Sequence, residues 1–164
     1  QNCILKRNNQ EQNIIWLGGN NATFSPTLAS SNNGGRSWNN LSLQIGGYNI
    51  VQFGTVTDIA FHSQDINTVY VSLSDKLLKT SNSGYTWTVQ CDTACCLKMI
   101  TDPEDGDHLW GCEGAKIKES FDAGVTWQEL DTSIDSLIWD MLLVEERNHL
   151  YISTKNGVHS YKLP

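Results

Sequence analysis

One eight-residue pattern occurs three times in this chain and limits its possible folds more than any other feature. The pattern reads [ST]-x-[DN]-x-G-x-[ST]-W, and its copies are residues 31–38, 80–87 and 120–127. The tryptophans that close the copies are about 40 to 50 residues apart, a period typical of folds that repeat one supersecondary unit. Five defined positions that recur in three copies indicate a repeated structural unit and not a chance match.

The residue types in the pattern predict a tight hairpin turn. The Asn or Asp in the third position accepts hydrogen bonds from nearby backbone N–H groups, and the glycine two residues later supplies a positive φ. The hydroxyls at both ends add further bonds, and the tryptophan opens the next strand and buries its ring between neighbouring sheets. These structural positions are Ser31, Asn33, Gly35, Ser37, Trp38, Thr80, Asn82, Gly84, Thr86, Trp87, Ser120, Asp122, Gly124, Thr126 and Trp127.

Short apolar segments surround each turn and predict β-strands. In the second and third repeats they are residues 56–61, 68–72, 77–80, 86–89, 96–100, 108–112, 116–120 and 126–130. In the first and fourth repeats they are residues 3–7, 14–18, 137–144, 149–153 and 158–162. Polar loops separate the first two strands of each repeat, and no segment has sustained helical periodicity.

Four strands per repeat at this period predict an all-β fold, a β-propeller of four-stranded antiparallel blades. About four blades fit into one domain or propeller segment, at residues 1–44, 54–91, 95–131 and 136–164, and the last blade lacks its turn and its fourth strand. Three arrangements stay open: a closed four-blade ring, part of a propeller of about six to ten blades, or two copies joined into one eight-blade ring. We favour the last two, because an open stack of blades exposes two apolar faces.

The repeated turns closely resemble the Asp-box, or BNR repeat, and the resemblance covers about residues 14 to 162. Families that carry this repeat include sialidases, xyloglucan-active glycoside hydrolases, sortilin-type sorting receptors, photosystem assembly factors and secreted bacterial proteins. In these families the boxes lie on the rim, away from the ligand face. The resemblance therefore implies an architecture and no single activity.

The charge of the chain argues against several classes of partner. The formal net charge is -7, and the 11 Lys and Arg residues form no basic run. Nucleic acids and anionic membranes both require a concentrated cationic surface. No apolar stretch is long enough to span a bilayer. We therefore expect no nucleic-acid ligand and no membrane insertion.

Five cysteines occur, and four of them are close together in the sequence. These four are Cys91, Cys95, Cys96 and Cys112. Their clustering in a β-rich chain favours disulfides and an oxidising compartment, with the pairing undetermined. A hairpin of strands 96–101 and 108–113 would allow Cys96 to face Cys112. Cys3 would then pair with a cysteine outside this segment or stay a free thiol. Buried thiols and a zinc site are the alternatives, although the spacing fits zinc poorly.

Two sequons, at Asn21 and Asn40, are compatible with N-glycosylation. The chain begins at Gln1 and not with methionine, which fits the removal of a signal peptide or a piece of a longer protein. We therefore expect a secreted or extracytoplasmic protein. The four histidines form no ligand pair and no glycine-rich phosphate loop occurs, so we expect no metal and no cofactor.

Sialidases bind their substrate carboxylate with three arginines and use a Tyr–Glu nucleophile pair. This chain has only Arg7, Arg36 and Arg147. Arg36 lies inside a repeated turn and Arg147 lies in a polar hairpin, and neither place fits a central pocket. A complete sialidase site is therefore excluded.

A two-carboxylate glycoside hydrolase needs a pair of acids across the scissile bond. Asp58 and Asp140 are the candidates, because each lies in the first strand of its repeat, the strand that lines a propeller channel. We favour the alternative that both are solvated or hydrogen-bonded channel residues. Trp139 is a candidate for stacking on a ligand, whereas Trp16 and Trp110 occupy second-strand positions and are expected in the core.

The repeats are accompanied by no convergent catalytic set. We therefore favour a non-catalytic, extracytoplasmic propeller module that binds a protein or glycan partner, and whose propeller is completed by further blades or a second copy. One alternative is a segment of a secreted glycoside hydrolase, xyloglucanase-like or sialidase-like, with part of the cleft elsewhere. The other is the ectodomain of a sortilin-type sorting receptor. If the protein is an enzyme, we expect a glycoside hydrolase.

Overall fold

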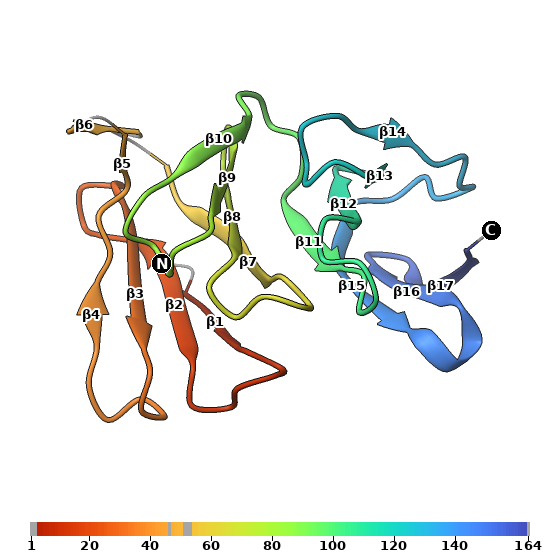
Figure 1. Cartoon of the computed structure of the whole chain (residues 1–164). Helices are drawn as coiled ribbons and strands as arrows, with labels where there is room; N and C mark the ends of the chain where they lie inside the picture. Colours follow the sequence, from red (N-terminus) through yellow and green to blue (C-terminus); the bar gives the residue numbers. More distant parts are fainter. Residues whose placement is uncertain (1–2, 46, 51–53, 164) are drawn as a thin grey trace.

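The computed structural model describes residues 3–45, 47–50 and 54–163. Over these residues the chain is all-β, and four antiparallel sheets lie side by side as the blades of a β-propeller, as the repeat predicts (Figure 1). The predicted blade limits at residues 1 and 164 lie outside the described residues. Of the described segments, none is a helix long and apolar enough to cross a membrane, and a short 3-10 turn, η1 (Glu145–Arg147), joins two strands.

Each blade is a sheet whose strands pair in sequence order. Blade 1 consists of β1 (Cys3–Arg7), β2 (Ile15–Asn20), β3 (Pro26–Ser31) and β4 (Asn39–Asn40). Blade 2 consists of β7 (Val56–Phe61), β8 (Val69–Leu73), β9 (Leu77–Thr80) and β10 (Thr88–Cys91). Blade 3 consists of β11 (Lys98–Thr101), β12 (Leu109–Glu113), β13 (Lys116–Ser120) and β14 (Gln128–Glu129). Blade 4 consists of β15 (Ile138–Val144), β16 (His149–Thr154) and β17 (Gly157–Lys162).

The structure differs from the predicted strands in several places. β3 was not predicted, because its sequence PTLASS contains no aromatic residue and a single β-branched one. A small hairpin of β5 (Gln44–Ile45) and β6 (Tyr48–Asn49) was not predicted either, and it comes between blades 1 and 2 in the sequence. The fourth strands of blades 2 and 3 start after the tryptophan that was expected to open them.

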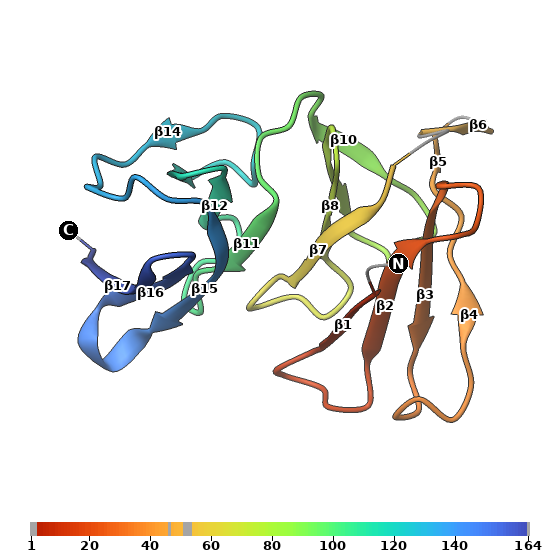
Figure 2. The ribbon, with the colours of Figure 1, turned by 180° about the vertical axis from the view of Figure 1, so that it is seen from behind.

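The first strands of the blades form the inner edge of the assembly. β1 contacts β7, β7 contacts β11, and β11 contacts β15, whereas no comparable contact joins β15 to β1 among the described residues. The blades therefore fan around an axis as an open arc, and the view from behind shows the same order (Figure 2). One face of blade 1 and one face of blade 4 have no neighbouring blade within the described part of the chain.

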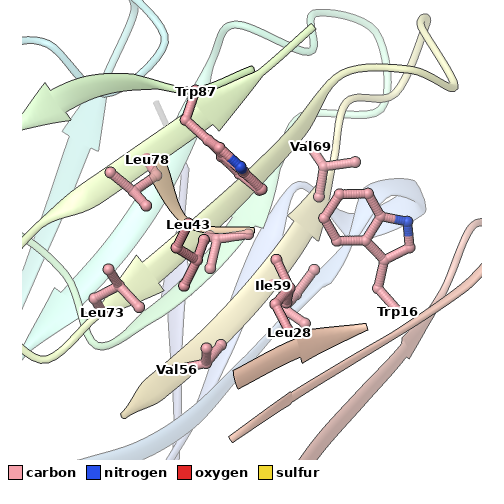
Figure 3. Packing of buried hydrophobic residues seen from close by; sticks show 10 residues of the cluster. Trp16, Leu28, Leu43, Val56, Ile59, Val69, Leu73, Leu78 and Trp87 are labelled. Atoms are coloured by element: carbon pink, nitrogen blue, oxygen red, sulfur yellow. The ribbon is translucent and has the colours of Figure 1, made fainter. Parts of the chain in front are cut away.

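An apolar joint forms between each pair of neighbouring blades. Figure 3 shows the joint between blades 1 and 2, where Trp16 and Leu28 of blade 1 meet Val56, Ile59 and Val69 of blade 2. The second joint packs Tyr70 and Leu77 against Met99 and Leu109, and the third packs Trp110 and Ile117 against Met141, Leu150 and Ile152. Because burial of a large side chain stabilises the fold by about 1.5–3 kcal/mol, these joints hold successive blades together.

The repeated turns have the hydrogen bonds that their sequence predicts. In the turn at residues 80–87, the Thr80 hydroxyl accepts from the Gly84 N–H at 2.9 Å, and the Asn82 side chain accepts from the Thr86 N–H at 2.8 Å. The other two turns have the same bonds. Gly84 has a φ of 88°, and Ser83 before it is also in the left-handed region, with a φ of 57°. The left-handed residue before the glycine was not predicted.

The burial predicted for the turn tryptophans holds for two of the three. Trp87 is 4% exposed in the joint with blade 1, and Trp127 packs into the joint with blade 2. Trp38 is 39% exposed, so the prediction that its ring is buried between sheets is wrong. The physical reason is that each ring faces the preceding blade, and blade 1 has no preceding blade among the described residues. Trp38 donates to the Gly35 carbonyl of its own turn, as Trp127 does to the Gly124 carbonyl.

Candidate functional site

The first strands of all four blades end around one axial cavity of about 470 Å³. Its walls come from the C-terminal ends of β1, β7, β11 and β15 and from the loops that follow them. Apolar side chains, among them Ile59, Met99 and Leu143, form one part of the lining. The polar part comes mainly from the end of β1, the loop that follows β1 and the loop after β7. These residues are Lys6, Arg7, Asn8, Asn9, Gln10, His62 and Ser63.

The cavity opens at the end of the propeller that carries the repeated turns. Successive strands run antiparallel, so the loop after the first strand and the turn after the third strand lie at the same end. Hydrogen bonds join the two in each of the first three blades: Gly34 N–H to the Asn13 carbonyl, Ser83 N–H to the Asn67 carbonyl, and Ala123 N–H to the Asp107 carbonyl. The resemblance implied a ligand face away from these turns, and the axial cavity does not lie on that face.

The loop after each first strand is fixed by the side chain that opens it. Asn8 accepts hydrogen bonds from the N–H groups of Gln10 and Glu11, at 2.8 and 2.9 Å. His62 Nδ1 accepts the corresponding pair in blade 2, and Asp102 accepts it in blade 3. The acceptor role of Nδ1 requires that a neutral His62 carries its proton on Nε2. These contacts hold the side chains of the cavity rim in one orientation.

Two buried polar atoms of the cavity lining have no hydrogen-bond partner. They are the amide nitrogen Nδ2 of Asn8, a residue that is 1% exposed, and the hydroxyl Oγ of Ser63. A buried donor without a partner costs about 1–3 kcal/mol, and native structures contain few of them. Because the other atom of the Asn8 amide is fixed by the loop, the side chain cannot turn to satisfy its N–H₂ group without losing two bonds. Both residues belong to the cavity lining.

Positive charge is concentrated on the blade 1 side of the cavity. Lys6 lies 3.2 Å from Asp58, and Arg7 is exposed at the end of β1. His62 Nε2 lies 3.8 Å from Asp107. A hydrogen bond from Lys79, assisted by one from the Tyr70 hydroxyl, lowers the pKa of Asp107 below its usual value, so that its carboxylate stays ionised. The cavity thus has donors and cations on the blade 1 side, an apolar wall, and Glu145 on the blade 4 side. Its blade 1 side suits a group with an acceptor oxygen beside an apolar side chain.

Asp58 has a structural position between three blades. It is 1% exposed, and its carboxylate accepts from the Ile59 N–H and from the Met99 N–H of blade 3, each at 2.9 Å. Lys6 of blade 1 completes its surroundings. A carboxylate with these partners is stabilised in place and is not free to act on a substrate.

Asp140 occupies the same register position in blade 4 that Asp58 occupies in blade 2. Asp58 pairs with Ser72 and Asp140 with Ser153, and each follows a register shift in its strand. Asp140 is exposed and accepts from the N–H of Met141 at 3.0 Å. Neither acid lines the axial cavity, so the structure does not bring the two candidate catalytic residues to this site.

The tryptophans outside the turns separate into buried and exposed ones. Trp16 and Trp110 are 2% and 3% exposed, as expected of core residues. Trp139 is 56% exposed beside Asp140 and does not line the axial cavity. Its role as a ligand-stacking residue stays a prediction.

The cysteines are thiols in the structure, and three of them, Cys95, Cys96 and Cys112, are buried. Hydrogen bonds from the Cys96 and Cys91 thiols lower the pKa of Cys95 to about 7. Cys112 pairs in register with Lys98, so the expectation that Cys96 faces Cys112 is wrong, because β11 begins two residues later than predicted. Disulfides among these cysteines, and glycans on the exposed Asn21 and Asn40, stay predictions.

Sequence reasoning did not identify Asn8, Gln10 or Ser63. A signal for them was present, since the loops 8–13, 62–67 and 102–107 follow the first strands at equivalent positions. Only their alignment shows that the opening residue is an acceptor in all three. Within the described ranges, no group of three or more His, Cys, Asp or Glu side chains is placed to hold a metal ion.

Comparison with known proteins gives the fold and no family. No protein-family model and no curated protein matches the chain. A GH74 enzyme of Niastella koreensis superposes with a TM-score of 0.73 at 16% identity, over 93% of this chain and 26% of that chain. YCF48 bound to D1 peptide superposes with a TM-score of 0.68 at 13% identity, over 99% of this chain and 55% of that one.

A chain of the nidogen/laminin complex is also similar, with a TM-score of 0.69 at 15% identity over 92% of this chain and 56% of that chain. All three are β-propeller proteins, and at these identities the likeness concerns the fold alone. The 164 residues span between about a quarter and about half of the length of these chains.

Proposed function

We propose that this chain is a non-catalytic, extracytoplasmic propeller module that binds a segment of a protein partner in its axial cavity. The observation that carries the proposal is the pair of unpartnered buried polar atoms, Asn8 Nδ2 and Ser63 Oγ, in one cavity. A ligand that offers acceptor oxygens to both atoms removes their desolvation cost on binding. Backbone carbonyls or a side-chain carboxylate of a peptide have this chemistry.

The lining favours a peptide over a sugar. Ile100, Leu142 and Leu143 provide an apolar surface that suits aliphatic side chains, whereas sugars are bound mainly by exposed aromatic rings and dense hydrogen-bond networks. YCF48 is seen with a bound peptide, so this fold is compatible with such a ligand. A glycan is the second class to test.

Two groups of residues support a location outside the cytoplasm. The thiols of Cys91 and Cys95 interact, and a disulfide between cysteines of this group in an oxidising compartment is part of the proposal. The sequon residues Asn21 and Asn40 are both exposed. The hydrogen bonds of the repeated turns support their assignment as Asp-boxes, on which the resemblance to secreted propellers depends.

The glycoside hydrolase alternative is weaker, because Asp58 is engaged by two backbone donors and a lysine. What remains in its favour is Asp140, which is exposed next to the exposed Trp139. Release of reducing sugar from a polysaccharide panel, lost in Asp140→Asn, would establish the hydrolase and overturn the binding module. The sortilin-type receptor alternative is supported by the same cysteines and sequons of this chain and by no further observation.

The test of the binding proposal uses a peptide array and a glycan array, followed by calorimetry on each hit. Ser63→Ala removes the unpartnered hydroxyl and nothing else, and we expect it to weaken peptide binding about tenfold, since one hydrogen bond is worth about 1 kcal/mol. Asn8→Asp keeps the acceptor that fixes the loop and replaces the free N–H₂ group by an oxygen. We expect this variant to lose binding.

The matched control is Ser81→Ala, which removes an exposed hydroxyl from a repeated turn outside the cavity. It should bind like the unmodified chain. Arrays without hits, or hits whose affinity neither cavity variant changes, would contradict the proposed site.

A further inference from the structure

The strand registers identify the side chains of each blade that face the next blade. At the centre of the second strand this position holds Trp16, Tyr70 and Trp110 in blades 1 to 3, with exposures of 2%, 0% and 3%. The third-strand position holds Leu28, Leu77 and Ile117, with exposures of 3%, 0% and 0%. In each case the next blade covers both side chains.

The same positions of blade 4 are apolar and have no neighbouring blade within the described part of the chain, although Tyr151 is half-buried. They hold Leu142 on β15, Tyr151 on β16 and Val158 on β17, which the pairing places side by side. Leu142 is 62% exposed and Val158 is 72% exposed. We call these three residues and Asp140 the front face of blade 4. Its composition is that of a blade joint, since isolated exposed apolar residues need no explanation but a register-matched set does.

Asp140 adds a polar feature that matches the joint between blades 2 and 3. There, the equivalent Asp58 uses one oxygen for its own strand and the other for the Met99 N–H of the next blade, at 2.9 Å. Asp140 makes the first bond, to the Met141 N–H. Its second oxygen is thus placed for the backbone N–H of a first strand that packs against blade 4.

Blade 1 has the complementary surface on its opposite side. Leu5 is 60% exposed, whereas the equivalent Ile59, Met99 and Met141 are 1%, 3% and 8% exposed against their preceding blades. Trp38 is 39% exposed where Trp87 is 4% exposed. Leu17 borders a hollow of about 420 Å³ on this side. We call Leu5, Arg7, Leu17 and Trp38 the rear face of blade 1.

The two faces match group by group. Met99 N–H donates to the second oxygen of Asp58, and Leu5 has the same register position in blade 1. The Leu5 N–H is therefore a matching donor for the second oxygen of Asp140. Arg7 has the position of Thr101, whose hydroxyl donates to the Phe61 carbonyl of the preceding blade at 2.9 Å. In a joint with blade 4 the Arg7 guanidinium reaches the end of β15, where Glu145 and Glu146 follow.

We propose that a second copy of this chain occupies these faces. The front face of blade 4 in one copy packs on the rear face of blade 1 in the other, and the reverse contact closes a ring of four plus four blades. Both faces belong to every copy, so that a two-fold arrangement forms the joint twice. Arg7 and Leu142 also line the axial cavity, but the proposed joint does not require a ligand there.

The test is the molar mass of the unglycosylated 164-residue chain, measured by light scattering over a dilution series. We expect twice the monomer mass of 18.3 kDa. Leu142→Asp on the front face and Leu17→Asp on the rear face should each give the monomer mass. An equimolar mixture of the two variants should restore a dimer, because one joint then has two unmodified faces.

The matched control is Val125→Asp, which places a charge on a 55% exposed apolar residue of a repeated turn outside both faces. It should stay dimeric. A monomer at every concentration of the unmodified chain, or a dimer that survives both face variants, would overturn the proposal.

Milder substitutions test the same joint if Leu142→Asp or Leu17→Asp prevents the chain from folding. Asp140→Ala and Arg7→Ala each remove one polar contact from each of the two joints. Since one charge-assisted hydrogen bond accounts for about tenfold and the joint forms twice, each variant should raise the dimer dissociation constant about a hundredfold. Far-ultraviolet circular dichroism establishes that each variant is folded. Unchanged dissociation constants in both folded variants would also overturn the proposal.

Discussion

The second strands of the inner blades differ from those of the outer blades in how completely they are buried. Every residue of β8 is buried, and so is every residue but the last of β12. In β2 and β16, buried and half-buried residues largely alternate. A strand covered on both faces is apolar along its length, whereas a strand covered on one face alternates. The burial pattern of a second strand therefore indicates whether its blade has a neighbouring blade on one side or on both sides.

The largest effect that tests this comparison is the loss of the central aromatic residue. Trp110→Ala should lower the free energy of unfolding by about 3–5 kcal/mol, because it leaves a cavity in a joint covered on both sides. Tyr151→Ala, at the same register position of blade 4, should cost about 1 kcal/mol or less in the monomer. Urea denaturation at a dilution that gives the monomer mass measures both. Equal losses would mean that blade 4 is covered in solution.

The buried and exposed aspartates give the next largest contrast. Asp58→Ala leaves two buried backbone N–H groups without an acceptor, and we expect a loss of about 2–4 kcal/mol. Asp140→Ala affects one bond at an exposed site and should cost about 0.5–1 kcal/mol in the monomer. The same denaturation experiment compares them. If Asp58→Ala were as mild as Asp140→Ala, the link that Asp58 makes between blades 2 and 3 would carry little stability.

The repeated turns should not show the difference between inner and outer blades. Asn82→Ala in blade 2 and Asn33→Ala in blade 1 each remove a side chain that accepts one backbone bond and donates one bond to a hydroxyl. We expect both to cost about 1–2 kcal/mol, because these contacts are local. A much larger loss in blade 2 would show that the turn depends on the neighbouring blade.

The smallest effect concerns pH at the joint between blades 2 and 3. The pKa of Asp107 is lowered in the folded chain, so the carboxylate contributes stability above its unfolded value of 3.8 and loses that contribution as the pH falls through the lower folded value. Its side chain is 49% exposed, so solvent screening limits the contribution to about 1 kcal/mol or less. Thermal unfolding of Asp107→Asn should differ from that of the unmodified chain at pH 7, and the difference should narrow below 3.8. A constant difference would exclude the ionic contribution.

Local features of the fold could be predicted from the sequence. The bonds of the repeated turns depend on residues within one eight-residue segment, and strands such as β7 carry their own apolar pattern. β3 was missed because its fold comes from pairing with β2 along its whole length and not from its own residue types. The exposure of Trp38 was missed because it depends on which blade precedes it.

The candidate site was less predictable, because it forms where four separate repeats meet. The sequence does not show that Asn8 is buried with its Nδ2 atom unpartnered, because this burial depends on the folded arrangement of the blades. Gln10 donates to the Ser63 carbonyl between these loops, a contact across 53 positions of the chain. Of the acids that the sequence did suggest, Asp58 links blades 2 and 3 and Asp140 is exposed on blade 4, and both lie outside the axial cavity.

The backbone bonds between each repeated turn and the first loop of the same blade have a consequence for how such a chain can grow. Gly34 to Asn13, Ser83 to Asn67 and Ala123 to Asp107 each begin and end within one repeat. A gene duplication that copies one repeat therefore copies a blade whose repeated turn is already hydrogen-bonded to its own first loop. Only the apolar side chains that face the new neighbouring blade must then change. Because these bonds need no distant partner, any blade can serve as the starting point for folding. Propellers with different blade numbers can thus arise from one repeat without a change in its turns.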